Sequence, residues 1–180
     1  SDIQSIEDLQ GKTVSIGAEE SGSEQNALQI LSAYGLNDRL VDTINLNYTD
    51  AADQLKAGKI DAIVITVGIP SPVVTELAGE CGIRLLNVDG TAAQRLLSSY
   101  NAYREVTIPA GTYPGQDADV QTVGVKAVLL ASDSLPAKQV QQLTELLFSS
   151  REALEEQLGL ALDPETDAVE GVGIPFHAGA

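Results

Sequence analysis

The residues best suited to chemistry in this chain are the glycines, serines and glutamates of the stretch GAEESGSE at positions 17–24. Ser21 and Glu24 have the S-x-x-E spacing of a capping box, which predicts that a helix begins here. Gly22 would let a ligand approach the backbone closely, and the free amides of a first helical turn attract carboxylates. The stretch is therefore either a capped helix start with nothing bound or one edge of an anion-binding site.

The same stretch shares one feature with phosphate-binding loops. Gly17 and Gly22 have the G-x-x-x-x-G spacing of a Walker A motif, but Ser23 stands where that motif needs lysine. Without the lysine, and with Glu19 and Glu20 nearby, the charge of a triphosphate would not be neutralised. The stretch is therefore not a P-loop.

A second candidate site follows the apolar run DAIVIT at residues 61–66, which predicts a buried strand. Thr66, Gly68 and Pro70 come at the end of this run and just after it. Ligands of open α/β sheets collect beyond the carboxyl ends of the strands, so these residues are placed to line a site. An ordinary strand-to-helix turn is the alternative.

A catalytic centre is hard to assemble from this chain. His177 is the one histidine and belongs to the terminal segment, while Cys81 is the one cysteine and has no basic neighbour in the sequence. An enzyme would need a nucleophile and a base that act as a pair, which the chain does not offer. We also find no calcium-loop motif and no cysteine zinc site, and expect no enzymatic activity, no metal and no cofactor.

Composition excludes several classes of partner. The chain of 180 residues has a formal net charge of −16 and no basic stripe, so nucleic acid and anionic membranes are unfavourable partners. No apolar run approaches the roughly 18 residues that cross a bilayer, so we expect no direct membrane insertion. The first residues lack a signal-peptide pattern, so an exported protein would carry its signal segment upstream.

The apolar pattern alternates strand-like with helix-like segments. The expected strands are residues 12–17, 46–48, 61–66, 83–88 and 122–131. The expected helices are residues 24–34, 50–56, a helix opened by Ser71 and Pro72, 92–100 and 136–158. This alternation predicts an α/β fold with a parallel or mixed sheet flanked by helices. Residues 108–121, rich in proline, glycine and polar side chains, predict an ordered connector.

Several segments, in this order, resemble the TAXI-type solute receptors of tripartite ATP-independent periplasmic (TRAP) transporters. They are IEDLQGKTVSIG at 6–17, SGSE at 21–24, AGKIDAIVITVGIP at 57–70, ELA at 76–78, IPAGTY at 108–113, residues 122–130 and IPFHAGA at 174–180. Each is weak alone, but their order and spacing extend over nearly the whole chain.

This resemblance implies a fold similar to type II periplasmic binding proteins, in which two α/β lobes close on a small ligand. It implies an extracytoplasmic receptor, periplasmic or a cell-surface lipoprotein, that delivers glutamate, a related amino acid or a dicarboxylate to membrane permease subunits. The residues that the resemblance places at the ligand are Ser21, Gly22, Ser23, Glu24, Thr66, Gly68, Pro70 and Tyr113.

The resemblance also implies a domain organisation. Residues 1–110 would form the second ligand-binding lobe, 108–121 a hinge, and 122–180 a strand, long helix and tail that normally return to the first lobe. Most of the first lobe is then expected to be missing from this sequence, which would hold half of a cleft. The same fold also serves as the ligand-sensing extracytoplasmic domain of signalling proteins, and the residues do not separate the two functions.

Overall fold

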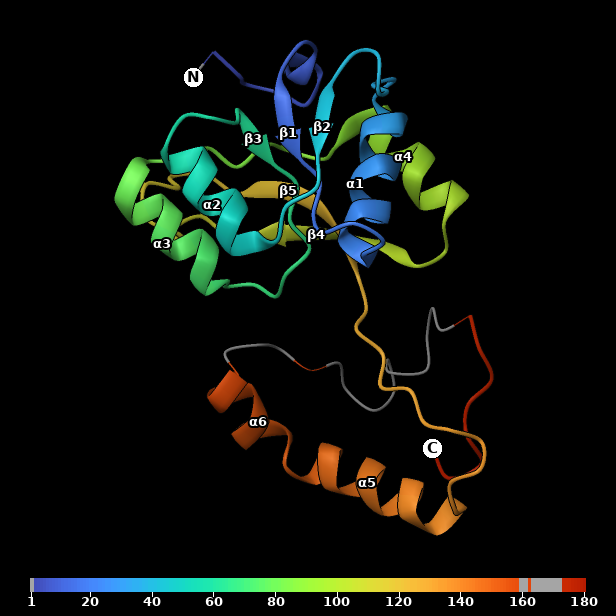
Figure 1. The fold of residues 1–180 in the computed structure, drawn as a ribbon. Helices are drawn as coiled ribbons and strands as arrows, with labels where there is room; N and C mark the ends of the chain where they lie inside the picture. The colour runs from blue at the N-terminus through green and yellow to red at the C-terminus, as the bar shows by residue number, and fades with distance from the viewer. Residues whose placement is uncertain (1, 159–161, 163–172) are drawn as a thin grey trace. The chain divides into compact units, whose positions relative to one another are not determined.

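The computed structural model describes residues 2–158, 162 and 173–180. The chain divides into two compact units, Ser1–Gly124 and Val125–Ala180 (Figure 1). Among the described residues, the strands belong to the first unit, with β5 ending at the boundary, and the second unit is helical. The expected mixed α/β class is confirmed.

A three-stranded parallel sheet forms the centre of the first unit. Its strands are β1 (Thr13–Ser15), β2 (Asp42–Ile44) and β3 (Ala62–Ile63), in the order β2-β1-β3. Helix α1 (Gly22–Ala33) connects β1 to β2, and helix α2 (Tyr48–Lys56) connects β2 to β3. The parallel sheet predicted from the strand–helix alternation is therefore present.

Helices cover the sheet on both sides. Helix α1 packs with α4 (Gly90–Ser99), and α2 packs with α3 (Pro72–Cys81). Figure 1 shows one pair on each side of the sheet. Because successive helices lie on opposite sides, the chain reverses its winding direction at the central strand β1.

The larger core cluster lies between β1, α1 and the N-terminal segment. Val14 and Ile16 of the β1 region meet Ala27 and Leu31, which share one face of α1 because they are four residues apart. The short 3-10 helix η1 (Glu7–Leu9) adds Leu9 to the cluster. Fully burying a side chain of this size contributes about 1.5–3 kcal/mol, so this packing fixes α1 against the central strand.

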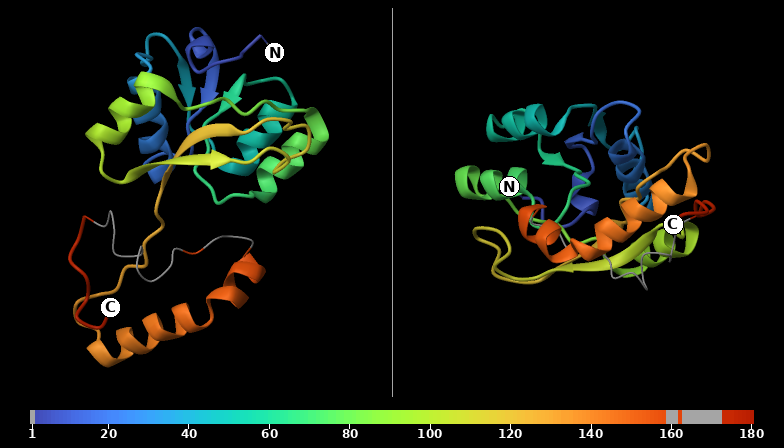
Figure 2. Two further views of the ribbon diagram at one scale, coloured as in Figure 1. Left: turned by 180° about the vertical axis from the view of Figure 1, so that it is seen from behind. Right: turned by 90° about the horizontal axis from the view of Figure 1, so that it is seen from below.

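A second sheet contains β4 (Tyr103–Ile108) and β5 (Val120–Val125), which lie side by side (Figure 2). The segment between them is held by Gln116, whose Nε2 donates to the carbonyl oxygens of Ile108, Pro109 and Ala118. The sequence pattern did not predict β4, because Arg104 and Glu105 interrupt its apolar alternation.

Two predicted strands are wrong. Residues 46–48 form no strand, because Asn47 caps α2 and its Oδ1 accepts from Asp50 N at 2.9 Å. Residues 83–88 also form no strand, although Val88 N donates to Gln121 O at 2.8 Å.

The predicted buried strand at 61–66 is shorter and more exposed than expected. Strand β3 comprises two residues, Ala62 and Ile63, and both are half-buried. The strand order places β3 at an edge of its sheet, so it has a neighbouring strand on one side only.

The second unit contains α5 (Ala137–Ser149) and α6 (Arg151–Leu158). The single helix expected over residues 136–158 is interrupted at Ser150, whose backbone leaves the helical geometry at φ −101° and ψ 12°. The strand expected over 122–131 ends at Val125, and Leu129 and Leu130 beyond it are 68% and 71% exposed. Residues 173–180 contain no helix or strand, and residues 163–172 of the expected C-terminal region lie outside the described residues.

Within the described parts of both units, no helix combines the length and the apolar character needed to cross a bilayer.

Candidate ligand-binding site

The residues that follow the three parallel strands are joined by side-chain hydrogen bonds at the carboxyl edge of the sheet. Asn45, which follows β2, donates from Nδ2 to Gly17 O, beyond β1, at 3.1 Å. Tyr48, the first residue of α2, donates from its hydroxyl to Thr66 O, beyond β3, at 2.9 Å. The loops of all three strands therefore meet where ligands of open α/β sheets bind.

Gly17 allows the loop after β1 to turn sharply into α1. Its φ is +99°, which is in the region that favours glycine, and a Cβ atom there would lie 2.9 Å from Cβ of Ser23. The close approach brings the first turn of α1 against the end of β1.

The predicted helix start is confirmed at Ser21, which is the N-cap of α1. Its backbone is extended and its Oγ accepts from Glu24 N at 3.1 Å. In a complete capping box, Glu24 would also accept from Ser21 N. Here Glu24 Oε2 accepts from Glu20 N at 2.7 Å instead, and Ser21 N donates to Ala18 O. Glu20 has a positive φ of 60°, which belongs to the tight turn that brings its amide to Glu24.

Both carboxylate oxygens of Glu24 are engaged by the protein. Oε2 accepts from Glu20 N, and Oε1 accepts from Asn45 Nδ2 at 2.8 Å. Glu24 thus ties the loop after β1 to the end of β2.

Two backbone donors stay available at the start of α1. Glu24 N is bound by Ser21 Oγ and Gln25 N by Ser21 O, whereas the amides of Gly22 and Ser23 have no acceptor within the part of the chain that the structure describes. The first amides of a helix have no intrahelical partner, and the helix dipole favours negative charge beside them.

A second set of polar side chains extends from this edge toward β4. The Ser23 hydroxyl is hydrogen-bonded to the Tyr48 hydroxyl. Asn26 Nδ2 donates to Thr66 Oγ1 at 3.2 Å, and the Tyr103 hydroxyl lies 2.9 Å from Asn26 Oδ1. The network therefore joins α1, α2, the segment after β3 and the first residue of β4.

The sequence-predicted site residues fall into two groups. Ser21, Ser23, Glu24 and Thr66 belong to these networks, and Gly22 is exposed at the helix start beside them.

Three predicted residues lie apart. Gly68 and Pro70 are exposed on the segment that leads into α3. Tyr113 is 5% exposed and packs with Val74 and Ala78, and its hydroxyl accepts from Ser71 N at 3.0 Å. Among the described contacts, none joins Tyr113 to the Ser21–Glu24 group.

Asn26, Asn45 and Tyr48 belong to the networks although the sequence did not single them out. Asn45 precedes the wrongly predicted strand 46–48, and Tyr48 is its last residue, whereas the structure ends β2 at Ile44 and begins α2 at Tyr48. The N-x-x-D spacing of Asn47 and Asp50 is a capping signature that could have placed the start of α2 and hence Tyr48.

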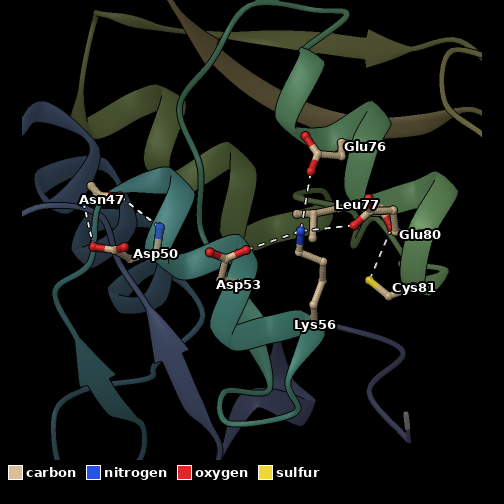
Figure 3. A network of polar contacts seen from close by, with 8 residues as sticks. All are labelled: Asn47, Asp50, Asp53, Lys56, Glu76, Leu77, Glu80 and Cys81. Carbon is tan, nitrogen blue, oxygen red and sulfur yellow. Dashed lines mark hydrogen bonds and ion pairs between the residues drawn. The ribbon is translucent and has the colours of Figure 1, made fainter.

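A different charged cluster joins α2 to α3 on the outside of the first unit (Figure 3). Lys56 Nζ lies 3.1 Å from Glu80, 3.3 Å from Asp53 and 3.5 Å from Glu76. The pKa of Lys56 is raised above its ordinary value, mainly by the hydrogen bond to Glu80 and then by the bond to Asp53. Lys56 of α2 thus bonds to Glu76 and Glu80 of α3, so this cluster is an ordinary helix–helix contact. Cys81 donates from Sγ to Leu77 O within α3 at 3.3 Å.

Other candidate features do not coincide with the network. A cavity of about 300 Å³ lies at the start of α4, lined by residues that include Tyr34, Asp89 and Thr91 and none of the predicted site residues. Across the described ranges, no group of three or more histidine, cysteine, aspartate or glutamate residues is arranged to hold a metal ion. His177 belongs to the second unit, where its Nδ1 accepts from Gly179 N.

Comparison with protein families matches the NMT1-like family over residues 1–180. This family is periplasmic-binding-protein-like, and the parallel sheet flanked by helices in the first unit is compatible with one lobe of such a protein. The family supports an extracytoplasmic, generally non-enzymatic role in binding a small solute for a membrane transporter. The chain belongs to the NMT1-like family.

Proposed function

We propose that this protein is the solute-capturing component of a TRAP transporter of the TAXI type. It would bind a small carboxylate-bearing ligand, such as glutamate, a related amino acid or a dicarboxylate, and deliver it to the permease subunits. The proposal rests on one observation: the first turn of α1 and the residues beyond β3 meet at the point where the sheet changes its winding direction.

The winding of the sheet explains why an opening is expected there. The chain leaves β1 through α1 on one side of the sheet, and reaches β3 through α2 on the other side (Figure 1). Helix α3, which follows β3, packs with α2, so the chain leaves β1 and β3 toward opposite sides of the sheet. Such switch points are where open α/β sheets bind ligands. Ser21, Gly22 and Ser23 follow β1, and Thr66, Gly68 and Pro70 follow β3.

The chemistry of the edge suits a carboxylate. The amides of Gly22 and Ser23 point from the start of a helix of 12 residues, and the Ser21 hydroxyl keeps its own proton because its oxygen accepts from Glu24 N. These groups are hydrogen-bond donors, and bonds from them to an ionised acceptor are stronger than bonds between neutral groups.

The second unit supports the proposed lobe organisation, in which residues 1–110 form the second lobe, 108–121 the hinge and 122–180 the part that returns to the first lobe. Helix α5 leaves Leu143 and Leu146 49% and 61% exposed, and the segment before it exposes Leu129 and Leu130. Leu143 and Leu146 are three residues apart and share one face of α5, and exposed apolar side chains grouped in this way mark surfaces that another protein surface covers. We propose that this surface packs on the first lobe.

The proposed function is tested by measuring the melting temperature of the intact receptor with a panel of amino acids and dicarboxylates. A ligand that binds only the native state at a hundred times its Kd stabilises that state by about 2.7 kcal/mol. We expect carboxylate-bearing compounds to raise the melting temperature. If none of them does so at millimolar concentration, while neutral or cationic solutes do, the proposed ligand class is wrong.

A further inference from the structure

The direction of the hydrogen bonds around Tyr48 is fixed by one partner that can only accept. The Tyr48 hydroxyl lies 2.9 Å from Thr66 O, and a backbone carbonyl has no proton to give. The single proton of Tyr48 therefore goes to Thr66 O. The hydrogen bond between Ser23 and Tyr48 must then run from the Ser23 hydroxyl to the Tyr48 oxygen.

This direction determines what Ser23 can offer to a ligand. The Ser23 hydroxyl has one proton, which Tyr48 takes, so toward a ligand Ser23 Oγ presents lone pairs only. The backbone amides of Gly22 and Ser23 are donors in the same helical turn. The edge thus combines donors for a carboxylate with one fixed acceptor beside them.

The Thr66 hydroxyl has the opposite role, because it can donate a hydrogen bond to a ligand. Its Oγ1 accepts from Asn26 Nδ2 at 3.2 Å, which leaves the Thr66 proton free to donate. Of the two hydroxyls Ser23 and Thr66, Ser23 is therefore the one whose proton is already used. A serine hydroxyl can donate or accept, so Ser23 is restricted to accepting only because its proton goes to the Tyr48 hydroxyl.

We propose that Tyr48 is a positioning residue that locks Ser23 as an acceptor and so selects ligands with an N–H or O–H group next to their carboxylate. The preferred class is α-amino and α-hydroxy acids, and the disfavoured class is α-keto acids and unsubstituted carboxylates, which have no donor for Ser23. This inference rests on the proposed function, since it assumes that the carboxylate binds at the start of α1.

The test compares ligands that differ at one carbon atom. Calorimetry on the intact receptor measures Kd for glutamate, 2-hydroxyglutarate, 2-oxoglutarate and glutarate, and for the shorter series alanine, lactate, pyruvate and propionate. We expect the amino members of the series that binds to bind at least about tenfold more tightly than the keto and unsubstituted members, as a hydrogen bond from the charged ammonium group allows. The hydroxy members, whose hydrogen bond to Ser23 joins two neutral groups, should have affinities between these two.

Two variants remove the fixed acceptor in different ways. Tyr48→Phe frees the Ser23 proton so that Ser23 can donate, and Ser23→Ala removes the oxygen altogether. In both, the ratio of affinities between the amino and keto members should fall to about threefold or less. A merely structural effect of Tyr48 would weaken all members equally and leave this ratio unchanged. Should Tyr48→Phe fold poorly, Ser23→Ala gives the same comparison.

Tyr34→Phe is the matched control, because it removes a tyrosine hydroxyl that bonds to Asp89 N and O away from this edge. Its affinity ratio should equal that of the wild type. A wild-type receptor that binds keto and unsubstituted acids as tightly as amino acids overturns the inference and leaves carboxylate capture standing. A receptor that binds no member of either series overturns both.

Discussion

Asn45 Nδ2 donates to Glu24 Oε1 at 2.8 Å and thereby joins the end of β2 to the first turn of α1. The same nitrogen donates to Gly17 O at 3.1 Å, so one side chain spans both ends of the loop between β1 and α1. Glu24 in turn holds Glu20 N. The shape of the candidate site therefore depends on an amide that lies outside the loop itself.

Replacing Asn45 tests this dependence. Asn45→Ala should lower the free energy of unfolding by about 1–2 kcal/mol, since it removes a hydrogen bond to a charged acceptor and a second bond to a carbonyl. Ligand affinity should fall as well, because the loop loses its tie to β2. Chemical denaturation and calorimetry measure the two effects.

Asn101→Ala is a suitable control for that experiment, because Asn101 is an exposed asparagine in the turn between α4 and β4. Surface substitutions of this kind are usually within about 0.5 kcal/mol. Equal effects of the two substitutions would show that Asn45 has no special part in holding the loop.

The serines at the start of α1 are expected to serve both stability and binding. Ser21→Ala removes the side chain that accepts from Glu24 N and should cost about 1 kcal/mol of stability. The double variant Ser21→Ala, Ser23→Ala should weaken binding of a carboxylate ligand at least about tenfold, which corresponds to about 1.4 kcal/mol.

Ser71→Ala is the control for these serine substitutions, since Ser71 is also a helix N-cap, that of α3, but makes no side-chain cap bond. Its substitution should leave ligand affinity unchanged. An unaltered calorimetric Kd in the double variant would count against the site at the start of α1.

Gly17 should tolerate substitution less well than another glycine of similar backbone conformation. Both Gly17 and Gly11 have positive φ, at 99° and 75°, but a Cβ atom on Gly11 would meet nothing within 4 Å. Gly17→Ala adds a contact at 2.9 Å with Cβ of Ser23 to the backbone strain of about 1–3 kcal/mol. Gly17→Ala should therefore destabilise the protein more than Gly11→Ala, and it should also weaken ligand binding by displacing Ser23. If Gly17→Ala and Gly11→Ala lower the denaturant midpoint equally, the close approach of Gly17 to Ser23 does not matter for stability.

The start of α1 could be predicted from the sequence because its determinants are local. Ser21 and Glu24 are three residues apart, and Gly17 precedes them directly. Capping depends on side chains reaching amides in the same turn, so spacing alone indicates the element. Pro72 as the first residue of α3 follows from the same kind of local rule and is also confirmed.

The partners of that helix start could not be predicted in the same way. The apolar and aromatic residues Leu46 and Tyr48 suggest a strand, yet β2 ends at Ile44 because its register with β1 pairs Ser15 with Ile44. Strand pairing is a contact between distant segments, and no spacing within 46–48 reveals it. Misplacing this strand hid the contact between Tyr48 and Ser23, from which the selectivity proposal follows.

The N-terminal segment should make stability depend on pH in the acidic range. Asp8 Oδ2 accepts from Gln4 N at 2.8 Å and from Ser5 N at 2.9 Å, and these backbone hydrogen bonds lower the pKa of Asp8 below its ordinary value of 3.8. A carboxyl group with a lower pKa in the folded state contributes stability that is fully present above the unfolded value. This stability is lost as the pH falls through the folded value.

Asp8→Ala should therefore lower the melting temperature at pH 7, and the difference from the wild type should shrink as the pH falls from about 4 downward. Asp2→Ala is the matched control, since Asp2 is an exposed aspartate of the same segment and the amides of Gln4 and Ser5 donate to Asp8 instead. Thermal melts of the three proteins between pH 7 and pH 3 measure the effect. A difference between Asp8→Ala and wild type that stays constant across this range would show that the Asp8 charge does not stabilise the segment.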